Sequence, residues 1–299
     1  MDINGRQNSE LNLKRLAAYR QLYSEAKNMT YIQFCLVGLA VVVLAIIGNA
    51  VSSEYGVYIG FLTFLCIFLN EIFLTKRIES RRLTAAIIQE KFDCDVLQIP
   101  PNTIKHDYGN MLETIQERSN KYLAKHNNFD LLMNWYPKFS TADSNLNRII
   151  CQNTNCWWDQ KLRKKYSGFL ISMVITIFVL LFLLSIYKGI TLGGFMQSVI
   201  FPIAPVGFFV YRIDRDNKKT IRNLNDLKIK IDAIIVKLKE RESYSDEKIM
   251  NDIRNLQDTI FDNRANSPQI PDRFYFKYRD QCEETAQEIT KELEKLITS

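Results

Sequence analysis

Arginine and aromatic side chains recur together in the polar parts of the chain, and their combination is the chemistry that holds a phosphorylated base. A guanidinium group binds phosphate oxygens through paired hydrogen bonds, while an aromatic ring stacks on a base. The candidate ligand-binding residues are Trp135, Arg148, Arg163, Arg264, Arg273, Tyr275 and Arg279. For each residue taken singly, the alternative is a ring packed between helices or an arginine in solvent. As a group, they predict where an anionic ligand binds.

Cysteine and histidine residues do not form a metal-binding pattern. A structural zinc ion needs four ligands, often supplied as closely spaced cysteine pairs. Cys151 and Cys156 have four residues between them, and the chain has two histidines, His106 and His126, to complete a set. Phosphate-binding glycine loops and the HExxH and GxSxG motifs do not occur in the sequence. We therefore predict no metal, no cofactor and no enzyme.

Four apolar blocks explain how so polar a chain is also 47% hydrophobic: residues 31–51, 55–74, 167–187 and 192–211. A helix needs roughly twenty apolar residues to cross a hydrocarbon core about 30 Å thick, so each block is long enough. The links between the first two blocks and between the last two are short, which predicts two hairpins. In lipid the backbone must satisfy its own hydrogen bonds, and helices do so.

Positive charge lies on one side of these spans. Basic residues flank the open ends of both hairpins: Lys14, Arg15, Arg20, Lys27, Lys76, Arg77, Arg81, Arg82, Lys161, Arg163, Lys164, Lys165, Arg212, Arg215, Lys218, Lys219 and Arg222. In the two short hairpin links, Lys188 is the one basic residue. The positive-inside rule then predicts a cytoplasmic N-terminal helix (1–30), insert (75–166) and tail (212–299). We interpret KLRKK at 161–165 as the anchor of the third span, with Trp157 and Trp158 near the headgroups.

The cytoplasmic parts read as helices. An apolar stripe at Ile78, Ala85, Ile88 and Phe92 continues the second span and stops before Pro100. Further helices are predicted at about 107–126, 246–262 and 272–297, and the start of the tail fits either a short coiled coil or an ordinary bundle helix. Period-two alternation typical of strands does not occur. The predicted fold class is an all-α integral membrane protein with four transmembrane helices.

Polar and helix-breaking residues inside the spans are candidates for a pore or gate: Asn70, Glu71, Ser172, Thr176, Pro202 and Pro205. A carboxylate at the bilayer centre costs about 3 kcal/mol, so Glu71 either pairs with a cation at the inner boundary or stands at the mouth of a conduit. Pro202 and Pro205 remove amide donors from the helix and predict a kink. The kink is either a fixed feature of helix packing or part of a gate. Ser172 and Thr176 share a helix face, as residues that pack helices together do.

Several unlike motifs, in order along the chain, carry a family resemblance. They are Ile3, Arg6, Gln7 and Asn8; LAAYRQLYSEAK at 16–27; WYP at 135–137; ICQNTNCWWDQKLRKKY at 150–166; and IPDRFYFKYRDQCEE at 270–284. With these motifs and the placement of the four spans, the chain resembles the SMODS-associating four-transmembrane effector family almost from end to end. It departs from the family at Tyr19, where glutamine is more frequent, and that difference touches no predicted site residue.

The resemblance implies a bacterial antiphage effector of the inner membrane, encoded beside a cyclic-oligonucleotide synthase. Such effectors are described as pore-forming proteins that respond to a nucleotide messenger and arrest or kill the infected cell. The expected partners are the lipid bilayer, a cyclic oligonucleotide and further copies of the chain, because four packed helices leave no room for a pore; a nucleic-acid polymer is not expected. The alternative function is a membrane-anchored signalling or scaffold protein whose spans only tether a helical domain.

Overall fold

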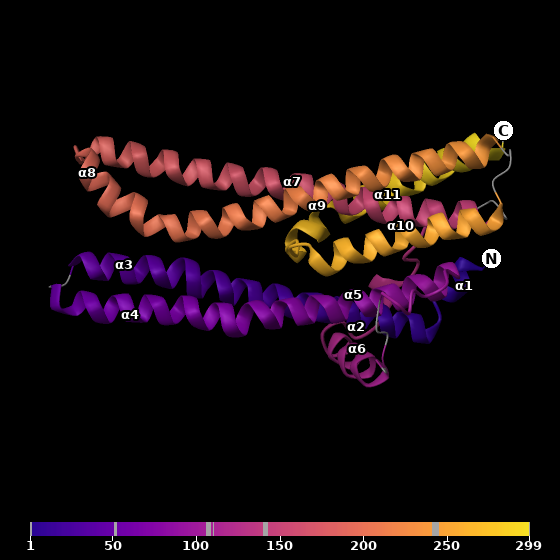
Figure 1. Ribbon diagram of the computed structural model, residues 1–299, viewed down its shortest axis with the longest axis horizontal. Coiled ribbons are helices and arrows are strands. Elements are labelled where there is room, and N and C mark those ends of the chain that lie inside the picture. Colours follow the sequence, from indigo (N-terminus) through magenta and orange to yellow (C-terminus); the bar gives the residue numbers. More distant parts are fainter. Residues whose placement is uncertain are drawn as a thin grey trace.

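Long helices in two layers make up the computed structural model of the chain, which describes residues 2–50, 53–105, 109, 111–139, 143–240 and 245–298 (Figure 1). The first layer comprises α1 (Ile3–Gln7), α2 (Glu10–Gln33), α3 (Ala40–Ala50), α4 (Ser53–Leu69), α5 (Lys76–Leu97) and α6 (Leu112–His126). The second comprises α7 (Ser144–Tyr187), α8 (Leu192–Phe195), α9 (Phe201–Glu240), α10 (Asp246–Asn266) and α11 (Asp272–Thr298). The described residues contain no strand, so the all-α prediction is confirmed for them.

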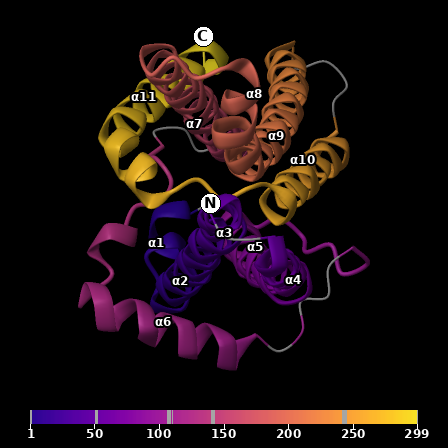
Figure 2. The same cartoon turned by 90° about the vertical axis from the view of Figure 1, so that its left-hand side faces the viewer.

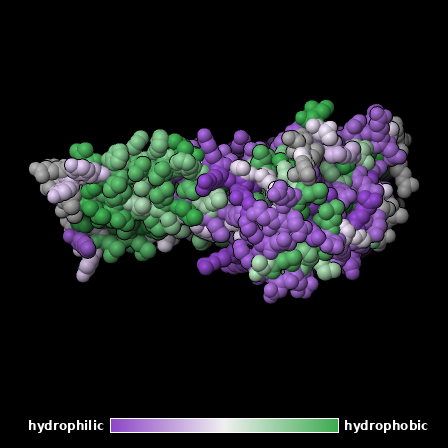
Figure 3. All heavy atoms as spheres, turned by 90° about the horizontal axis from the view of Figure 1, so that it is seen from below, coloured by the Kyte–Doolittle hydropathy of each residue, from purple (hydrophilic) through white to green (hydrophobic). Residues whose placement is uncertain are grey.

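Apolar and polar surfaces divide the molecule across its long axis. One end is covered by hydrophobic side chains and the other mostly by hydrophilic ones (Figure 3). Both chain termini lie at the hydrophilic end, and α8 and the adjoining ends of α3 and α4 lie at the tip of the apolar end (Figures 1 and 3). In water this much exposed apolar surface is unfavourable, so the apolar end fits a lipid environment.

Three helices of the described residues are long and apolar enough to cross a membrane: Glu10–Leu44, Tyr55–Leu97 and Ser144–Tyr187. The prediction of four spans is therefore corrected to three on this criterion. The fourth predicted span, 192–211, is divided among α8, a π-helical turn (η4, Met196–Ile200) and the start of α9. The side chains of Gln197, Ser198 and Pro202 within it lie outside the described residues. Its chain still runs back alongside α7 in the second hairpin (Figure 1).

The predicted borders between spans and cytoplasmic parts do not interrupt the helices. α2 joins α3 through a π-helical segment (η1, Phe34–Leu39), and α4 joins α5 through another (η2, Asn70–Thr75). α7 runs without a break for 44 residues and α9 for 40 residues. Each layer is thus built on continuous rods that extend from the hydrophilic end into the apolar end, which lets a displacement at one end reach the other.

The two hairpins meet through α3 and α9. In the apolar half α4 packs on α3, α3 on α9, and α9 on α7, and the view along the molecule shows these helices in cross-section (Figure 2). Gly38 lies at this contact, where an added Cβ would stand 3.6 Å from Val206 of α9, an ordinary van der Waals distance. Phe34 and Phe209 pack across the same contact with their rings tilted by 50° and their centroids 5.6 Å apart.

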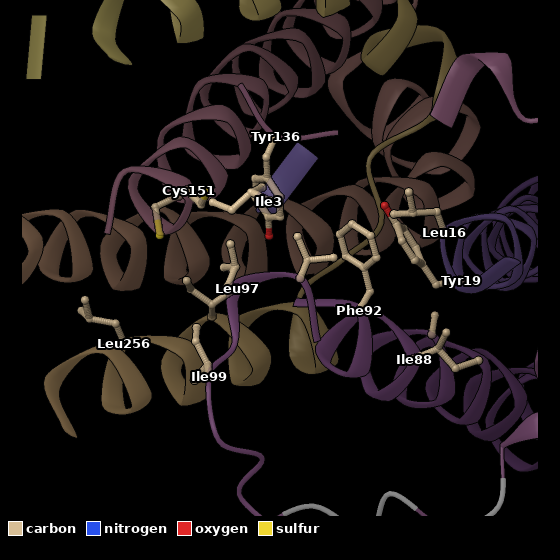
Figure 4. Packing of buried hydrophobic residues seen from close by; sticks show 14 of the residues in the cluster. Ile3, Leu16, Tyr19, Ile88, Phe92, Leu97, Ile99, Tyr136, Cys151 and Leu256 are labelled. Carbon is tan, nitrogen blue, oxygen red and sulfur yellow. The ribbon is translucent and has the colours of Figure 1, made fainter. Parts of the chain in front are cut away.

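The hydrophobic core lies in the hydrophilic half and joins the two layers. α2 packs on α5 and α6, while α10 packs on α5, α7 and α9. Side chains from α1, α2, α5, α7 and α10 meet there (Figure 4). The predicted stripe of Ile78, Ala85, Ile88 and Phe92 is buried. α5 ends at Leu97, where Gln98 takes a left-handed conformation (φ 52°), so the stop before Pro100 is as predicted.

Candidate functional site

A cavity of about 490 Å³ lies between the two layers in the hydrophilic half. Its walls come from α2, α7, α10, α11 and the loop 131–137, with single residues from α5 and α9. We call it the interlayer cavity. Five of the seven predicted ligand-binding residues line it: Trp135, Arg163, Arg264, Tyr275 and Arg279. They are far apart in the sequence, and the fold brings them to one place.

Arg148 and Arg273 do not line the cavity. The Arg148 Nε donates to the carbonyl of Leu97 (2.7 Å) and its Nη1 to Asn145 Oδ1 (2.8 Å), so this side chain ties α7 to the end of α5. Burial lowers the pKa of Arg148. Arg273 is exposed on α11. Arg273 therefore matches the alternative of an arginine in solvent, whereas Arg148 is a buried structural residue, which neither reading predicted.

Positive charge predominates on the cavity walls. Five lining residues are cationic (Arg20, Lys27, Arg163, Arg264 and Arg279) and three are acidic (Asp159, Asp272 and Glu283). Each acid has a cation partner: Asp272 pairs with Lys27, Asp159 with Arg163 at 2.9 Å, and Glu283 with Arg279 at 2.6 Å. Arg264 pairs with Asp93, which lies outside the cavity walls. The walls therefore have an excess of positive charge, which favours an anionic ligand.

Arg264 connects the cavity to a buried polar network between α5 and α10. Asp93 is fully buried and accepts from Arg264, from Tyr136 Oη (2.6 Å) and from Gln257 Nε2 (2.9 Å). Gln257 also donates to Glu90 Oε2 at 2.8 Å. Burial acts to lower the pKa of Arg264, but the charge of Asp93 outweighs it and the pKa is raised. The guanidinium therefore stays charged, and a ligand that contacts it also perturbs the contact between layers.

The N-terminal motif holds the WYP loop against the cavity. The Tyr136 backbone N–H donates to Gln7 Oε1 (2.7 Å), and Gln7 Nε2 donates back to the Tyr136 carbonyl (3.4 Å). Asn8 and Asn134 exchange a similar pair at 3.1 and 2.9 Å. The rings of WYP form part of the cavity wall, and Trp135 packs edge-on against Tyr19 with centroids 6.0 Å apart.

The sequence reading of the stretch before the third span needs correction. Trp158 lines the cavity and stacks on Tyr275 with ring centroids 6.0 Å apart, instead of lying at the headgroups. Arg163 within KLRKK is buried and bonds to Asn217 and to the carbonyl of Pro268, both at 3.0 Å. α7 continues straight through this stretch, so only the helix face opposite the cavity is free to meet lipid headgroups.

Two further cavity residues, Tyr19 and Arg20, were not among the predicted ligand residues. Tyr19 is the position that departs from the family pattern, and the structure places it in the cavity wall. Arg20 lies over the ring of Tyr275, with Cζ 4.9 Å from the centroid. Helical periodicity could not single them out because Tyr19 also belongs to the buried face of α2. Arg20 contacts Tyr275 of α11, which is more than 200 residues away in the chain, so the sequence around Arg20 gives no sign of this contact.

The predicted pore or gate residues differ in their exposure within the protomer. Asn70 is buried on η2 and its Oδ1 has no partner among the described residues, whereas Glu71 beside it is exposed. Ser172 and Thr176 are exposed on α7, so they do not pack helices together within the protomer. Pro205 lies inside the first turns of α9, and the chain bends between α8 and the middle of α9 (Figure 1). The side chain of Pro202 lies outside the described residues.

Cys151 and Cys156 are buried free thiols, and burial raises the pKa of both. Within the described part of the chain, no three His, Cys, Asp or Glu side chains gather closely enough to hold a metal ion. His106, one of the two histidines weighed for such a site, lies outside that part. A protonated thiol is a poor metal ligand and nucleophile, so these cysteines act as small apolar core residues.

The arrangement now has three components: apolar rods, a cation-rich cavity between them, and a loop held by an N-terminal motif. The family model of the SMODS-associating 4TM effector domain matches residues 1–293. The chain belongs to this family. Among curated proteins, the 4TM effector chain is similar to a probable CBASS effector molecule of Bacillus cereus (strain VD146), with 25% identity over 300 residues that cover 97% of each chain. No solved structure matches it.

Proposed function

We propose that this chain is an antiphage effector of the bacterial inner membrane that binds a cyclic oligonucleotide in the interlayer cavity and then opens a pore. The family and the relative's description as a probable CBASS effector support the role in defence. The observation that carries the proposal is the continuity of the helices. α7 lines the cavity at its hydrophilic end and continues as the most apolar span. α2 also lines the cavity, and it continues through η1 and α3 into the apolar end.

In this proposal residues 192–211 are the fourth span. The segment returns beside α7 in the apolar half, and it has no charged residue before Arg212. The hydrophilic half then lies on the cytoplasmic side, with both termini, because the basic residues cluster there and Lys188 alone lies at the opposite tip. A messenger made in the cytoplasm could reach the cavity in this orientation.

Binding between the layers supplies a route from ligand to membrane. A ligand shifts an equilibrium only if it binds one state more tightly than the other. The cavity walls come from both layers, Tyr19 and Tyr23 from α2 and Arg163, Arg264 and Tyr275 from the second layer. A ligand that draws these walls together must also move the rods, and the hairpins at their far ends move with them.

A pore requires several copies of the chain. Within one protomer the order of packing is α4 on α3, α3 on α9 and α9 on α7, an arrangement that leaves the outer helices uncovered on their far sides. The exposed Ser172 and Thr176 on α7 would then face lipid in a monomer and a neighbouring copy or the conduit in an oligomer. We therefore propose a homo-oligomer in which the exposed face of α7 takes part.

Leakage from liposomes tests this function. Purified protein is reconstituted into dye-filled liposomes and exposed to a panel of cyclic di- and trinucleotides. We expect one class of probe to release dye. Arg279→Gln should reduce that release and Arg273→Gln should not, because both arginines belong to α11 but only Arg279 lines the cavity. Binding without leakage under any probe would contradict the pore and favour a membrane-anchored signalling or scaffold protein.

A further inference from the structure

Hydrogen-bond donors without partners gather on the walls of the interlayer cavity. Among the described side chains, buried polar atoms that lack a partner include Tyr19 Oη, Arg20 Nη1, Trp158 Nε1 and Asn263 Nδ2, and all four residues line this cavity. Other unpartnered atoms belong to described residues elsewhere: the Nε donors of Arg15, Arg118 and Arg254, and the side-chain carbonyl oxygens of Asn70, Gln152 and Asn153. Buried polar groups in folded proteins are nearly always bonded, so four orphaned groups in one cavity indicate a missing acceptor.

Arg20 is the centre of this group. Its described contacts are with aromatic rings: Cζ lies 4.9 Å from the centroid of Tyr275 and 5.7 Å from that of Phe276. Asp272 is the acid closest to it in charge effect, but Asp272 forms its ion pair with Lys27. No described carboxylate forms an ion pair with Arg20 itself. An arginine held between rings, with a buried donor atom left over, is pre-positioned for an anion.

The other three donors lie in the same cavity as Arg20: Tyr19 adjoins it in the chain, Trp158 contacts the same ring, and Asn263 lines the same walls. Tyr19 precedes it on α2 and is itself only 3% exposed. Trp158 stacks on the same Tyr275 that Arg20 covers. Asn263 is 5% exposed, and its Oδ1 is already occupied by Asn223 at 3.1 Å, which turns its amide N–H₂ toward the remaining space. These donors come from three helices, so no local turn or helix end explains them.

Resting on the proposed function, we infer that Tyr19, Arg20, Trp158 and Asn263 form the subsite for a phosphodiester of the cyclic oligonucleotide. A phosphodiester offers two unesterified oxygens with one negative charge, which matches one guanidinium and a few neutral donors. Tyr275 contacts both Arg20 and Trp158, so it holds these two donors at one place in the cavity. The cavity arginines that already have carboxylate partners then serve the rest of the ligand or hold the walls.

Binding measurements on the purified full-length protein in detergent test the subsite. The probes are a panel of cyclic di- and trinucleotides, and the variants are Arg20→Gln, Tyr19→Phe and Trp158→Phe. For a probe that binds the natural chain, Arg20→Gln should weaken binding about 10- to 100-fold and each of the other two about 3- to 10-fold. The matched control is Arg222→Gln, an exposed arginine of α9 outside the cavity, which should bind normally.

A second ligand separates a contact from a folding defect. In a second probe, a neutral methylphosphonate replaces one phosphodiester of the cyclic dinucleotide. The natural chain should bind this probe more weakly than the unmodified one, whereas Arg20→Gln should bind the two probes with nearly equal affinity. Thermal unfolding without ligand should show that Arg20→Gln is as stable as the natural chain, because Arg20 has no polar partner to lose; if it is not, Arg20→Lys takes its place. Equal binding by the natural chain and Arg20→Gln overturns the subsite and leaves the proposed function standing. A natural chain that binds no probe overturns direct sensing and the subsite together.

Discussion

The carboxylate of Asp93 in the hydrophilic half is fully buried and depends on hydrogen bonds from its neighbours. It receives bonds from Arg264 and Gln257 of α10 and from Tyr136 of the loop after α6. Removing one partner of a buried ion pair leaves the other charge without compensation, at a cost of about 3–5 kcal/mol. We expect Asp93→Ala to lower the free energy of unfolding by about that amount, measured by denaturant titration in detergent.

Two comparisons make this prediction specific. Asp280→Ala removes an exposed carboxylate of α11 and should change stability little. Replacing Arg264 by Met in the Asp93→Ala background removes the uncompensated charge, so part of the loss should return. If Asp93→Ala and Asp280→Ala have the same stability, the network between α5 and α10 does not hold the layers together.

The sequence identifies site residues where their chemistry is unusual for their position and misses them where it is ordinary. The arginines and aromatic residues of α10 and α11 stand out in polar stretches, and Arg264, Tyr275 and Arg279 do line the cavity. Tyr19 and Arg20 resemble any buried tyrosine and any membrane-flanking arginine. Their place in the cavity depends on contacts with Trp135 and Tyr275, which only the assembled fold provides.

At the scale of elements, α1 acts as a clamp on the loop after α6. Gln7 is fully buried and bonds to both backbone groups of Tyr136. Loss of both bonds leaves a buried N–H and carbonyl unpaired, which costs about 1–3 kcal/mol. We expect Gln7→Ala to make the loop 133–139 a preferred site of limited proteolysis and to weaken binding of any cavity ligand.

The control for the clamp is Glu10→Gln, a change at an exposed side chain at the start of α2. It should leave the digestion pattern as in the natural chain. Cleavage of Gln7→Ala at the same sites and rates as the natural chain would show that α1 does not restrain the loop.

The bend in α9 belongs to the same scale, and Pro205 is its local cause. Proline lacks the N–H that would bond to the carbonyl of Phe201, and a π-helical turn precedes it. Alanine restores that donor. If the bend is part of the pore, Pro205→Ala should reduce probe-induced dye release about tenfold while probe affinity stays unchanged.

Gly207→Ala is the matched control for this helix. A Cβ at Gly207 would have no described atom within 4 Å, so the substitution adds a methyl group without changing the bend. It should release dye as the natural chain does. Normal release by Pro205→Ala would assign the bend to static packing.

Local sequence signals fix most helix limits but not the joints between segments. α10 and α11 match the predicted helices 246–262 and 272–297 to within a few residues, and the stretch NSPQIP at 266–271 contains the break between them. The π-helical segments η1 and η2 were not predicted, because they alter the backbone without a proline to announce them. Gln33, directly before η1, donates a hydrogen bond to Thr75, the last residue of η2, at 3.2 Å. The two continuous rods are therefore joined close to their π-helical segments.

At the scale of the whole molecule, the main feature is the division into an apolar end and a hydrophilic end. The apolar end, the hydrophilic end and the continuous rods between them place a ligand cavity and a membrane region in the same elements (Figures 1 and 3). The sequence predicts this division from hydropathy and charge alone. It does not predict that the cavity lies between the layers, since that follows from how α2 meets α10 and α11.

The orientation of this division can be measured by cysteine labelling. Asn120→Cys on α6 and Glu284→Cys on α11 place thiols on exposed positions of the hydrophilic end, and Lys188→Cys places one at the tip of the second hairpin. With a membrane-impermeant maleimide on spheroplasts, we expect Lys188→Cys to be labelled and the other two to react only after lysis. The natural chain is the blank, because its cysteines in the hydrophilic half are buried and protonated. Labelling of Asn120→Cys or Glu284→Cys from outside would put the cavity beyond the reach of a cytoplasmic messenger, and sensing in the interlayer cavity would then have to be abandoned.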